Sequence, residues 1–258
     1  TLERRWPRPD ERIPGRYDVE SVPFYPQKAF QCGSAALASV LSWSGLQVDP
    51  EVVMAQVFTP SQKGSLQSAM ISAARRHGRI AYLLGGPDAP PSGPDALIRE
   101  IAAGHPVVVL QNLGLSWFPV WHYAVVVGYD LHEGVLVLHS GDTPGKKVSA
   151  RVFKNTWARS DYWGLLVLPP GRFPATATED TFVSALIGLE NAGQWQAAVA
   201  GYQAALTRWP DSLGALMGLG NSYHALGGKR AAEKTFWEAT RRFPTNGSAF
   251  NNLAQVLW

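Results

Sequence analysis

Apolar residues follow two different patterns along this chain of 258 residues. In the first pattern, runs of four to six Val, Leu, Ala or other apolar residues are bounded by Gly, Pro or Asp, which is typical of buried strands. These runs lie in HPVVVLQ, HYAVVVGYD, GVLVLHSG and WGLLVLPP. In the second pattern, from Thr181 onward, the spacing of apolar residues is helical and few strand-forming residues occur.

A helix is expected to precede the strands. The segment CGSAALASVLSWSG, from Cys32 to Gly45, carries small and apolar residues at helical spacing, which predicts a buried helix with a glycine stop. We expect no helical crossover between the later strands, so the pattern predicts an α+β domain with an antiparallel sheet over residues 22–170. Two prolines, Pro169 and Pro170, close this region, and residues 171–180 are predicted to be a linker.

The remainder of the chain contains an internal repeat. Identical residue types recur at an offset of 34 in Gly193 and Gly227, Ala198 and Ala232, Ala205 and Ala239, Arg208 and Arg242, Pro210 and Pro244, and Ala215 and Ala249. Helical units of this length resemble the tetratricopeptide repeat (TPR), which implies an all-α domain of paired helices over residues 181–258. We expect two full units to about Ser248 and the first helix of a third unit, whose apolar stacking face is left uncovered.

The first 21 residues show no helical or strand periodicity. They contain three prolines and five arginines, so we expect an extended, solvated lead-in over residues 1–21. The first residue is Thr1 rather than Met, which is compatible with removal of a targeting segment or with a trimmed chain.

Composition narrows the classes of function. A net charge of +3 and a pI near 9.0 are too weakly basic for a nucleic-acid-binding surface, so no nucleic acid is expected as a partner. No apolar run approaches the roughly 18–20 residues that a transmembrane helix needs. The single cysteine, Cys32, excludes an intrachain disulfide and a metal site with several cysteine ligands. We therefore expect no metal and no cofactor, and we expect Cys32 to act as a thiol.

Cys32 lies where a thiolate would be stabilised. A lone cysteine is more often a small buried apolar residue. Cys32, however, is at the predicted start of a helix, where unpaired backbone N–H groups and the positive end of the helix dipole stabilise a thiolate. Gly33 removes side-chain bulk beside the sulfur, and the Gln27 amide offers an N–H donor to an oxyanion. The segment therefore indicates a nucleophile.

Among the six histidines, His122 is best placed to be the base that a nucleophilic thiol requires. It opens the apolar strand HYAVVVGYD directly after Trp121, so we expect its ring at the mouth of the sheet. A histidine at a strand start more often has a structural role than a catalytic one. Because a cysteine lies at a helix start in the same chain, we favour the catalytic role for His122. By contrast, His105 precedes Pro106 and is expected in a turn.

These residues together resemble a known family. VPFYPQKAFQCGSAALASVL and, ninety residues after the cysteine, HYAVVVGYD are similar to the papain-like cysteine peptidase domain that processes bacteriocin precursors by cutting leader peptides after a double glycine. The resemblance covers residues 22–170. It implies that Cys32 is the nucleophile, His122 the general base and acid, and Gln27 the oxyanion-hole donor, acting on a peptide bond through an acyl-enzyme.

Two positions depart from the family pattern. The residue before the cysteine, an Asp in the family, is Gln31 here. The third catalytic member is also an Asp in the family, and a gap-free count places His139 there, with Ser140 next and Asp142 just beyond. His139 or Asp142 is therefore expected to orient the His122 imidazole, or the site works as a Cys–His dyad.

Three functions remain open. The first is a cysteine peptidase whose repeats recruit a protein substrate or partner on a concave surface. The second is a catalytically inactive papain-like protein that binds peptides as an adaptor, and the third is a thiol acyltransferase or amidase acting on a non-protein amide. Polar residues that either line the concave surface or are ordinary solvated positions are Asn221, His224, Asn251 and Asn252.

The resemblance also bears on location. Similar bacterial chains that pair such a peptidase-like domain with helical repeats look like exported, often lipid-anchored envelope proteins. This implies the bacterial periplasm or the outer membrane, with a peripheral membrane tether N-terminal to this chain. A free thiol in an oxidising compartment weighs against that location.

Overall fold

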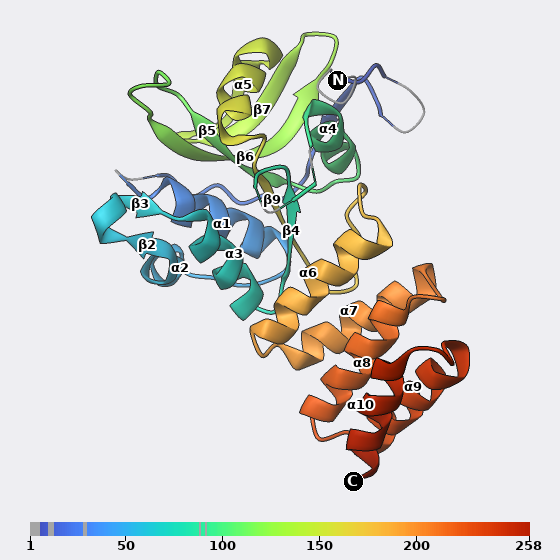
Figure 1. Cartoon of the computed structure of the whole chain (residues 1–258). Helices are drawn as coiled ribbons and strands as arrows, with labels where there is room; N and C mark the ends of the chain where they lie inside the picture. The colour runs from blue at the N-terminus through green and yellow to red at the C-terminus, as the bar shows by residue number, and fades with distance from the viewer. Residues whose placement is uncertain (1–5, 10–12, 28–29, 88, 91) are drawn as a thin grey trace. The chain divides into compact units, whose positions relative to one another are not determined.

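The computed structural model of the chain describes residues 6–9, 13–27, 30–87, 89–90 and 92–258 (Figure 1). Contacts between residues divide the chain into two compact units. The larger unit comprises the described residues up to 74, together with 81–167 and 174–176. The smaller unit comprises residues 75–80, 168–173 and 177–258.

In the described residues, a seven-stranded sheet forms the centre of the larger unit. Its strands follow the order β4–β9–β5–β6–β7–β8, and β1 also pairs with β6. Neighbouring strands from β9 to β8 run antiparallel, and so do β1 and β6, as the sequence predicted for this sheet. The strands are β1 (Arg16–Asp18), β4 (Ile80–Leu84), β5 (Val107–Asn112), β6 (Trp121–Asp130), β7 (Val135–Ser140), β8 (Thr143–Ser149) and β9 (Gly164–Leu168).

Helices cover both faces of this sheet, with α1 on one side and α5 on the other (Figure 1). All residues of β5 and β9 are buried as a result. The helix α1 is buried from Gly33 to Leu41 and ends just before Gly45, whose φ of 90° suits glycine, so the predicted buried helix is confirmed. The helices are α1 (Cys32–Trp43), α2 (Pro50–Val57), α3 (Gln67–Arg76), α4 (Pro94–Ala102) and α5 (Ala150–Trp157). Two short strands, β2 (Phe58–Thr59) and β3 (Gly64–Ser65), form a separate hairpin.

The region between β7 and β9 differs from the sequence expectation. It contains a strand, β8, and a helix, α5, where we expected no helix between the later strands. The strand was missed because its residues, TPGKKVS, are almost all exposed and lack the apolar run that marks a buried strand. The sheet is antiparallel despite α5, because β9 pairs with β5 in the antiparallel sense.

The predicted lead-in is also partly structured. β1 lies within it and pairs with β6, and the side chain of Ile13 is fully buried. The segment is extended over β1, as expected, but the expectation of a solvated segment was wrong for Ile13 and Val19, which are buried. Three of its arginines, Arg4, Arg5 and Arg12, lie outside the described residues.

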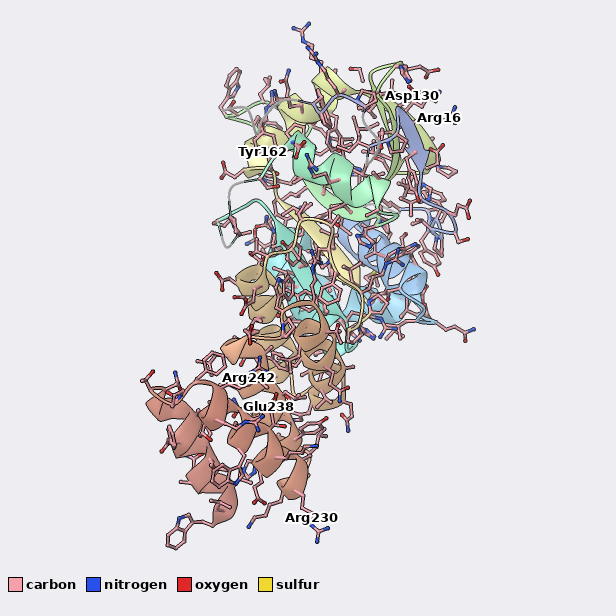
Figure 2. The ribbon with its side chains drawn as sticks, turned by 90° about the vertical axis from the view of Figure 1, so that its right-hand side faces the viewer. Arg16, Asp130, Tyr162, Arg230, Glu238 and Arg242 are labelled. Atoms are coloured by element: carbon pink, nitrogen blue, oxygen red, sulfur yellow. The ribbon has the colours of Figure 1, made fainter. Side chains whose placement is uncertain are left out.

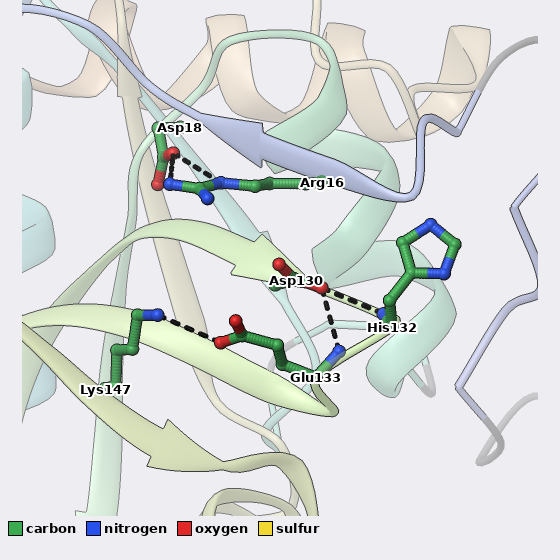
Figure 3. A network of polar contacts seen from close by, with 6 residues as sticks. All are labelled: Arg16, Asp18, Asp130, His132, Glu133 and Lys147. Carbon is green, nitrogen blue, oxygen red and sulfur yellow. Dashed lines mark hydrogen bonds and ion pairs between the residues drawn. The ribbon is translucent and has the colours of Figure 1, made fainter.

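Polar contacts secure the turn between β6 and β7 (Figure 3). Asp130 Oδ1 accepts hydrogen bonds from the backbone N–H groups of His132 and Glu133, each at 2.9 Å. Glu133 in turn pairs with Lys147 of β8 at 2.9 Å. The turn and the edge strand are thus joined by the same residues.

A buried carboxylate ties the segment 174–176 to α4. Glu100 is fully buried and accepts hydrogen bonds from the Ala175 N–H (3.0 Å), the Thr176 N–H (2.8 Å) and the Thr176 hydroxyl (2.6 Å). Its other close neighbour is His105 Nδ1 at 2.8 Å, and the His105 side chain is buried as well. His105 therefore belongs to a buried polar cluster, a role that its position before Pro106 does not predict.

The smaller unit contains five helices in its described residues, and their bounds repeat. The first and last residues of α8 lie 34 positions after those of α6, and the same offset relates α9 to α7. Matching residues are buried at matching places: Ala198 and Tyr202 of α7 correspond to Ala232 and Phe236 of α9. The helices are α6 (Glu179–Asn191), α7 (Trp195–Arg208), α8 (Leu213–Ala225), α9 (Lys229–Arg242) and α10 (Gly247–Leu257).

Arg242 joins the end of α9 to the turn that precedes α8. Its guanidinium donates to Glu238 on the same helix at 3.1 Å (Figure 2 labels both residues). It also pairs with Asp211. None of the described helices in either unit has both the length and the apolar character needed to cross a membrane.

Candidate functional site

The predicted nucleophile, Cys32, is the first residue of α1. The first intrahelical bond runs from the Ala35 N–H to the Gln31 carbonyl, so the N–H groups of residues 32–34 precede the helical ladder. Those N–H groups and the helix dipole place partial positive charge around the half-buried thiol. The Gln31 side chain, which replaces the family's Asp, donates instead to Met54 Sδ at 2.9 Å.

Cys32, His122 and Gln27 line one cavity of about 900 Å³ in the larger unit. They come from three elements: the start of α1, the start of β6, and the extended segment before α1. The hairpin of β2 and β3 contributes Gly64 and Ser65 to the cavity wall. The structure therefore brings together the three residues that the sequence singled out.

The His122 ring is held by Ser140. Its Nε2 lies 2.9 Å from Ser140 Oγ, the last residue of β7. Burial of the ring lowers the pKa of His122 below its ordinary value, and the positive charge of Lys146 lowers it further. The neutral imidazole, which can accept a proton, is therefore favoured.

The two candidates for the third member make other contacts. His139 Nε2 donates to the Val22 carbonyl at 3.1 Å, and its Nδ1 accepts from the Gly145 N–H at 3.2 Å. Asp142 is exposed and accepts a hydrogen bond from the Thr143 hydroxyl. We expected His139 or Asp142 to contact the His122 ring. In the structure, Ser140 makes that contact instead.

The geometry of the strands explains this outcome. His139 pairs with Val125, three residues beyond His122, and side chains alternate between the faces of a strand. His139 and His122 therefore lie on opposite faces of the sheet, whereas Ser140 shares the face of His122. A count along the sequence could not decide the face, because the pairing of β6 with β7 also shifts register between Val126 and Gly128.

Gln27 is fixed against the start of β6 and the turn after β7. Its side-chain Oε1 accepts from the Gly141 N–H at 3.0 Å, and its backbone N–H donates to the Gly141 carbonyl at 3.0 Å. Its Nε2 donates to the Tyr123 carbonyl at 3.5 Å. An amide nitrogen carries two N–H bonds, and the contacts of the described residues use one of them.

Other cavity residues escaped the sequence analysis. Tyr123 is buried and donates its hydroxyl to the Ser65 carbonyl at 3.1 Å. Burial raises the pKa of Tyr123, and negative charge on the nearby Cys32 sulfur would raise it further, so the phenol keeps its proton. Gly33, which the sequence analysis named for leaving room beside the sulfur, also leaves room for β3, because a Cβ there would lie 2.6 Å from the Ser65 side chain.

Three residues that line the cavity have left-handed backbone conformations although none is glycine. They are Phe30 (φ 65°), Lys63 (φ 47°) and Asp161 (φ 54°). Such conformations cost of order 1–3 kcal/mol each and cluster at functional sites. No composition or spacing signal in the sequence marks these positions.

Comparison with known proteins identifies a related family. The sequence model described as "Peptidase_C39 like family" matches residues 19–164, which include Gln27, Cys32, His122 and Ser140. No curated protein shows significant similarity to the chain.

Several solved structures are similar to part of the chain. A protein from Bacillus anthracis described as a C39-like peptidase has 17% identity, with 59% of this chain and 97% of that chain covered and a TM-score of 0.48. A double glycine motif protease from an AMS/PCAT transporter, in complex with the leader peptide, has 19% identity, coverage of 58% and 93%, and a TM-score of 0.43. The peptidase domain of Streptococcus ComA, a bi-functional ABC transporter involved in a quorum sensing pathway, has 18% identity, coverage of 58% and 99%, and a TM-score of 0.43.

Proposed function

Because the chain belongs to the Peptidase_C39 like family, we propose that its larger unit is a cysteine peptidase with Cys32 as nucleophile and His122 as base. One observation carries this proposal. Cys32 at the N-terminal end of α1 and His122 at the start of β6 line the same cavity. A thiol at a helix N-terminus and a neutral imidazole in one cavity are the parts that thiol-based acyl transfer needs.

The proposed reaction begins with proton transfer from the Cys32 thiol to the imidazole of His122. Because Ser140 occupies Nε2, the accepting atom is Nδ1. The sulfur attacks the peptide carbonyl carbon, and the C=O electron pair becomes an oxyanion. The Cys32 backbone N–H and the second N–H of the Gln27 amide stabilise that oxyanion.

The intermediate then collapses. Its C–N bond breaks as the His122 imidazolium gives its proton to the leaving amine, which leaves a thioester on Cys32. Water attacks the thioester carbon while His122 accepts one of its protons. The C–S bond breaks, the proton returns to the sulfur, and the acid product leaves with the free thiol restored.

Ser140 gives this site a weaker orienting group than a carboxylate. A serine hydroxyl can fix the tautomer and the plane of the His122 ring, but it carries no negative charge to stabilise the imidazolium. We therefore infer that the site works as a Cys–His dyad oriented by Ser140. Its turnover is expected to be slower than that of a site with a carboxylate third member.

The second candidate function is peptide binding without turnover. The neutral Ser140 beside His122 and the Gln31 before Cys32 favour it, since both replace an Asp of the family pattern. A thiol acyltransferase or amidase would use the same dyad, and the acceptor of the acyl group would distinguish it from a peptidase. The expected location in the bacterial envelope stays a prediction, which cell fractionation would test.

We propose that the smaller unit is a TPR array that recruits the protein substrate or a partner. The 34-residue repeat of its helices supports this proposal. Asn221 of α8 and Asn252 of α10 are joined by a hydrogen bond of 3.0 Å on an exposed face of successive repeats. Replacing both with Arg is expected to raise KM for a protein substrate and leave cleavage of a short peptide unchanged.

A peptide library analysed by mass spectrometry tests the peptidase function. We expect wild-type chain to produce cleaved peptides, and the Cys32→Ala and His122→Ala variants to produce none. Asp142→Ala is the matched control and is expected to cleave normally. Binding of peptides by wild-type chain without any cleavage would favour the second function, and transfer of an acyl group to an added amine would favour the third.

A further inference from the structure

The connection between β5 and β6 exposes an unusual amount of apolar surface. Trp117 is 80% exposed and Phe118 is 73% exposed, although both residue types are usually well buried. In Figure 1 the loop between β5 and β6 projects beyond the ends of these strands. The remaining large apolar residues of this segment are each about half exposed: Leu113, Leu115, Val120 and Trp121.

Hydrogen bonds hold this segment in a defined hairpin. Asn112 Oδ1 accepts from the N–H groups of Gly114 (2.9 Å) and Val120 (3.0 Å), and Leu115 and Phe118 exchange two backbone bonds of 3.1 Å. Gly114 packs so closely on the returning strand that a Cβ there would lie 2.4 Å from the Phe118 carbonyl oxygen. The exposed apolar side chains are therefore presented by an ordered backbone.

A residue outside the hairpin, Arg159, also holds its base in place. The Arg159 guanidinium donates to the carbonyl oxygens of Asn112 (3.0 Å) and Gly114. Ordering the hairpin costs conformational entropy, and exposing Trp117 and Phe118 to water gains no hydrophobic stabilisation. The arrangement fits a role in which these two side chains contact something other than water.

The tip of the hairpin is separate from the cavity. Pro119, Val120 and Trp121 line the cavity, whereas Trp117 and Phe118 do not. A peptide that binds in a cleft contacts concave surface, and side chains as exposed as those of Trp117 and Phe118 lie on convex surface. Convex apolar side chains are buried when they insert into a partner. The interfacial region of a lipid bilayer accepts aromatic side chains in this way.

The charges around the hairpin suit a negatively charged bilayer surface. No Asp or Glu occurs from Asn112 to Trp121. Arg159 stands at the base of the hairpin, Lys63 lines the adjoining cavity, and Lys146 lies close enough to His122 to lower its pKa. Among the described residues, carboxylates also occur in this region: Asp161 lies in the cavity wall, and Asp142 accepts a hydrogen bond from Thr143.

We propose that the β5–β6 hairpin docks the larger unit on lipid bilayers that contain anionic lipids. Trp117 and Phe118 enter the interfacial region, and Arg159 with the nearby lysines contacts the headgroups. The mouth of the cavity, bordered by Val120 and Trp121, then lies next to the bilayer surface. This docking does not depend on whether the cavity performs peptide cleavage.

Vesicle flotation with the full chain tests the proposal. We expect the chain to float with vesicles of phosphatidylcholine and phosphatidylglycerol, and less with vesicles of phosphatidylcholine alone or at high salt. The double variant Trp117→Ser with Phe118→Ser is expected to weaken binding to the mixed vesicles about tenfold or more. A circular dichroism spectrum and thermal midpoint equal to those of wild type would show that the variant is folded.

The matched control replaces an exposed aromatic pair elsewhere, Trp237→Ser with Phe250→Ser, and is expected to bind vesicles like wild type. Failure of wild-type chain to bind either vesicle would overturn the proposal, as would undiminished binding by the Trp117/Phe118 variant. If that variant instead raised KM for a short soluble peptide, the tip would be a substrate-binding element, and docking on lipid would be wrong.

Discussion

His122 Nε2 and Ser140 Oγ lie 2.9 Å apart, and this contact is the orienting contact that the sequence had assigned to His139 or Asp142. The two residues come from neighbouring antiparallel strands, β6 and β7, and share one face of the sheet. The contact engages the Nε2 atom of the ring. Among the described residues, no hydrogen bond or ion pair joins the imidazole to a carboxylate.

Substitutions at Ser140 should lower or raise kcat/KM, depending on the residue introduced. Ser140→Ala removes a neutral hydrogen bond, which contributes roughly 1 kcal/mol, so we expect kcat/KM to fall about fivefold. Ser140→Asp supplies the missing charge and is expected to raise kcat/KM about tenfold or more. Steady-state cleavage of one library-derived peptide measures both effects, and Thr143→Ala serves as the control. A rate unaffected by either change would remove Ser140 from the mechanism.

The acid side of the pH–rate profile should respond to Lys146. Burial and the positive charge of Lys146 lower the pKa of His122, so its neutral form persists to more acidic pH than for an ordinary histidine. Because Lys146→Gln removes one of these two causes, the pKa of His122 should rise and the acid limb of kcat/KM should move to higher pH. Lys147→Gln, at the next residue, removes a lysine that pairs with Glu133 and should leave the limb in place. Equal profiles for both variants would contradict the assignment of that limb to His122.

The close contact at Gly33 predicts a loss of stability. A Cβ at this position would lie 2.6 Å from the Ser65 side chain and 3.2 Å from the Tyr123 ring. Gly33→Ala must therefore displace β3 from the first turn of α1, and we expect the free energy of unfolding to fall by about 1–3 kcal/mol. Gly64→Ala, also in this region, meets its nearest atom at 3.7 Å and should change stability by less than about 0.5 kcal/mol. Urea unfolding followed by tryptophan fluorescence compares the two, and equal midpoints would refute the packing argument.

The buried carboxylate of Glu100 is expected to be the most sensitive polar position of α4. Glu100→Ala leaves the N–H groups of Ala175 and Thr176 without their acceptor in a buried place, which should cost on the order of 3 kcal/mol. Asp95→Ala, on the same helix, breaks only the exposed pair with Arg99 and should cost less than about 0.5 kcal/mol. Thermal unfolding distinguishes these changes. A small effect of Glu100→Ala would mean that water replaces the lost carboxylate.

Local sequence patterns were sufficient to predict the helices and strands that contain apolar runs. The sequence predicted α1 from the spacing of its small residues, and β5, β6, β7 and β9 from their β-branched and Leu-rich segments, because burial leaves a mark on composition. The offset of 34 residues likewise appears in the helix bounds of the smaller unit. The strands β1 and β8 consist mostly of exposed residues and left no such mark, so both were missed. The helix α5 was missed because it is only eight residues long, and its two fully buried residues, Phe153 and Trp157, are too few to establish a helical period.

The contacts of the site required three-dimensional information. Gln27, Cys32 and His122 were found because a helix start and a strand start can be recognised in the sequence. The partner of His122 depends on strand face and register, so a count along the chain selected His139 while the ring meets Ser140. Similarly, the Glu100–His105 contact joins residues that no periodicity relates.

The central claim is that Cys32 is a nucleophile activated by His122, and alkylation by iodoacetamide tests it most directly. The rate of modification of Cys32 at neutral pH is measured by mass spectrometry for the folded chain, the urea-unfolded chain and the His122→Ala variant. We expect the folded wild-type thiol to react faster than the unfolded one, since thiolate is the reactive form, and we expect the variant to lose that advantage. A folded thiol that reacts no faster than the unfolded one, or equally fast with and without His122, would contradict the account.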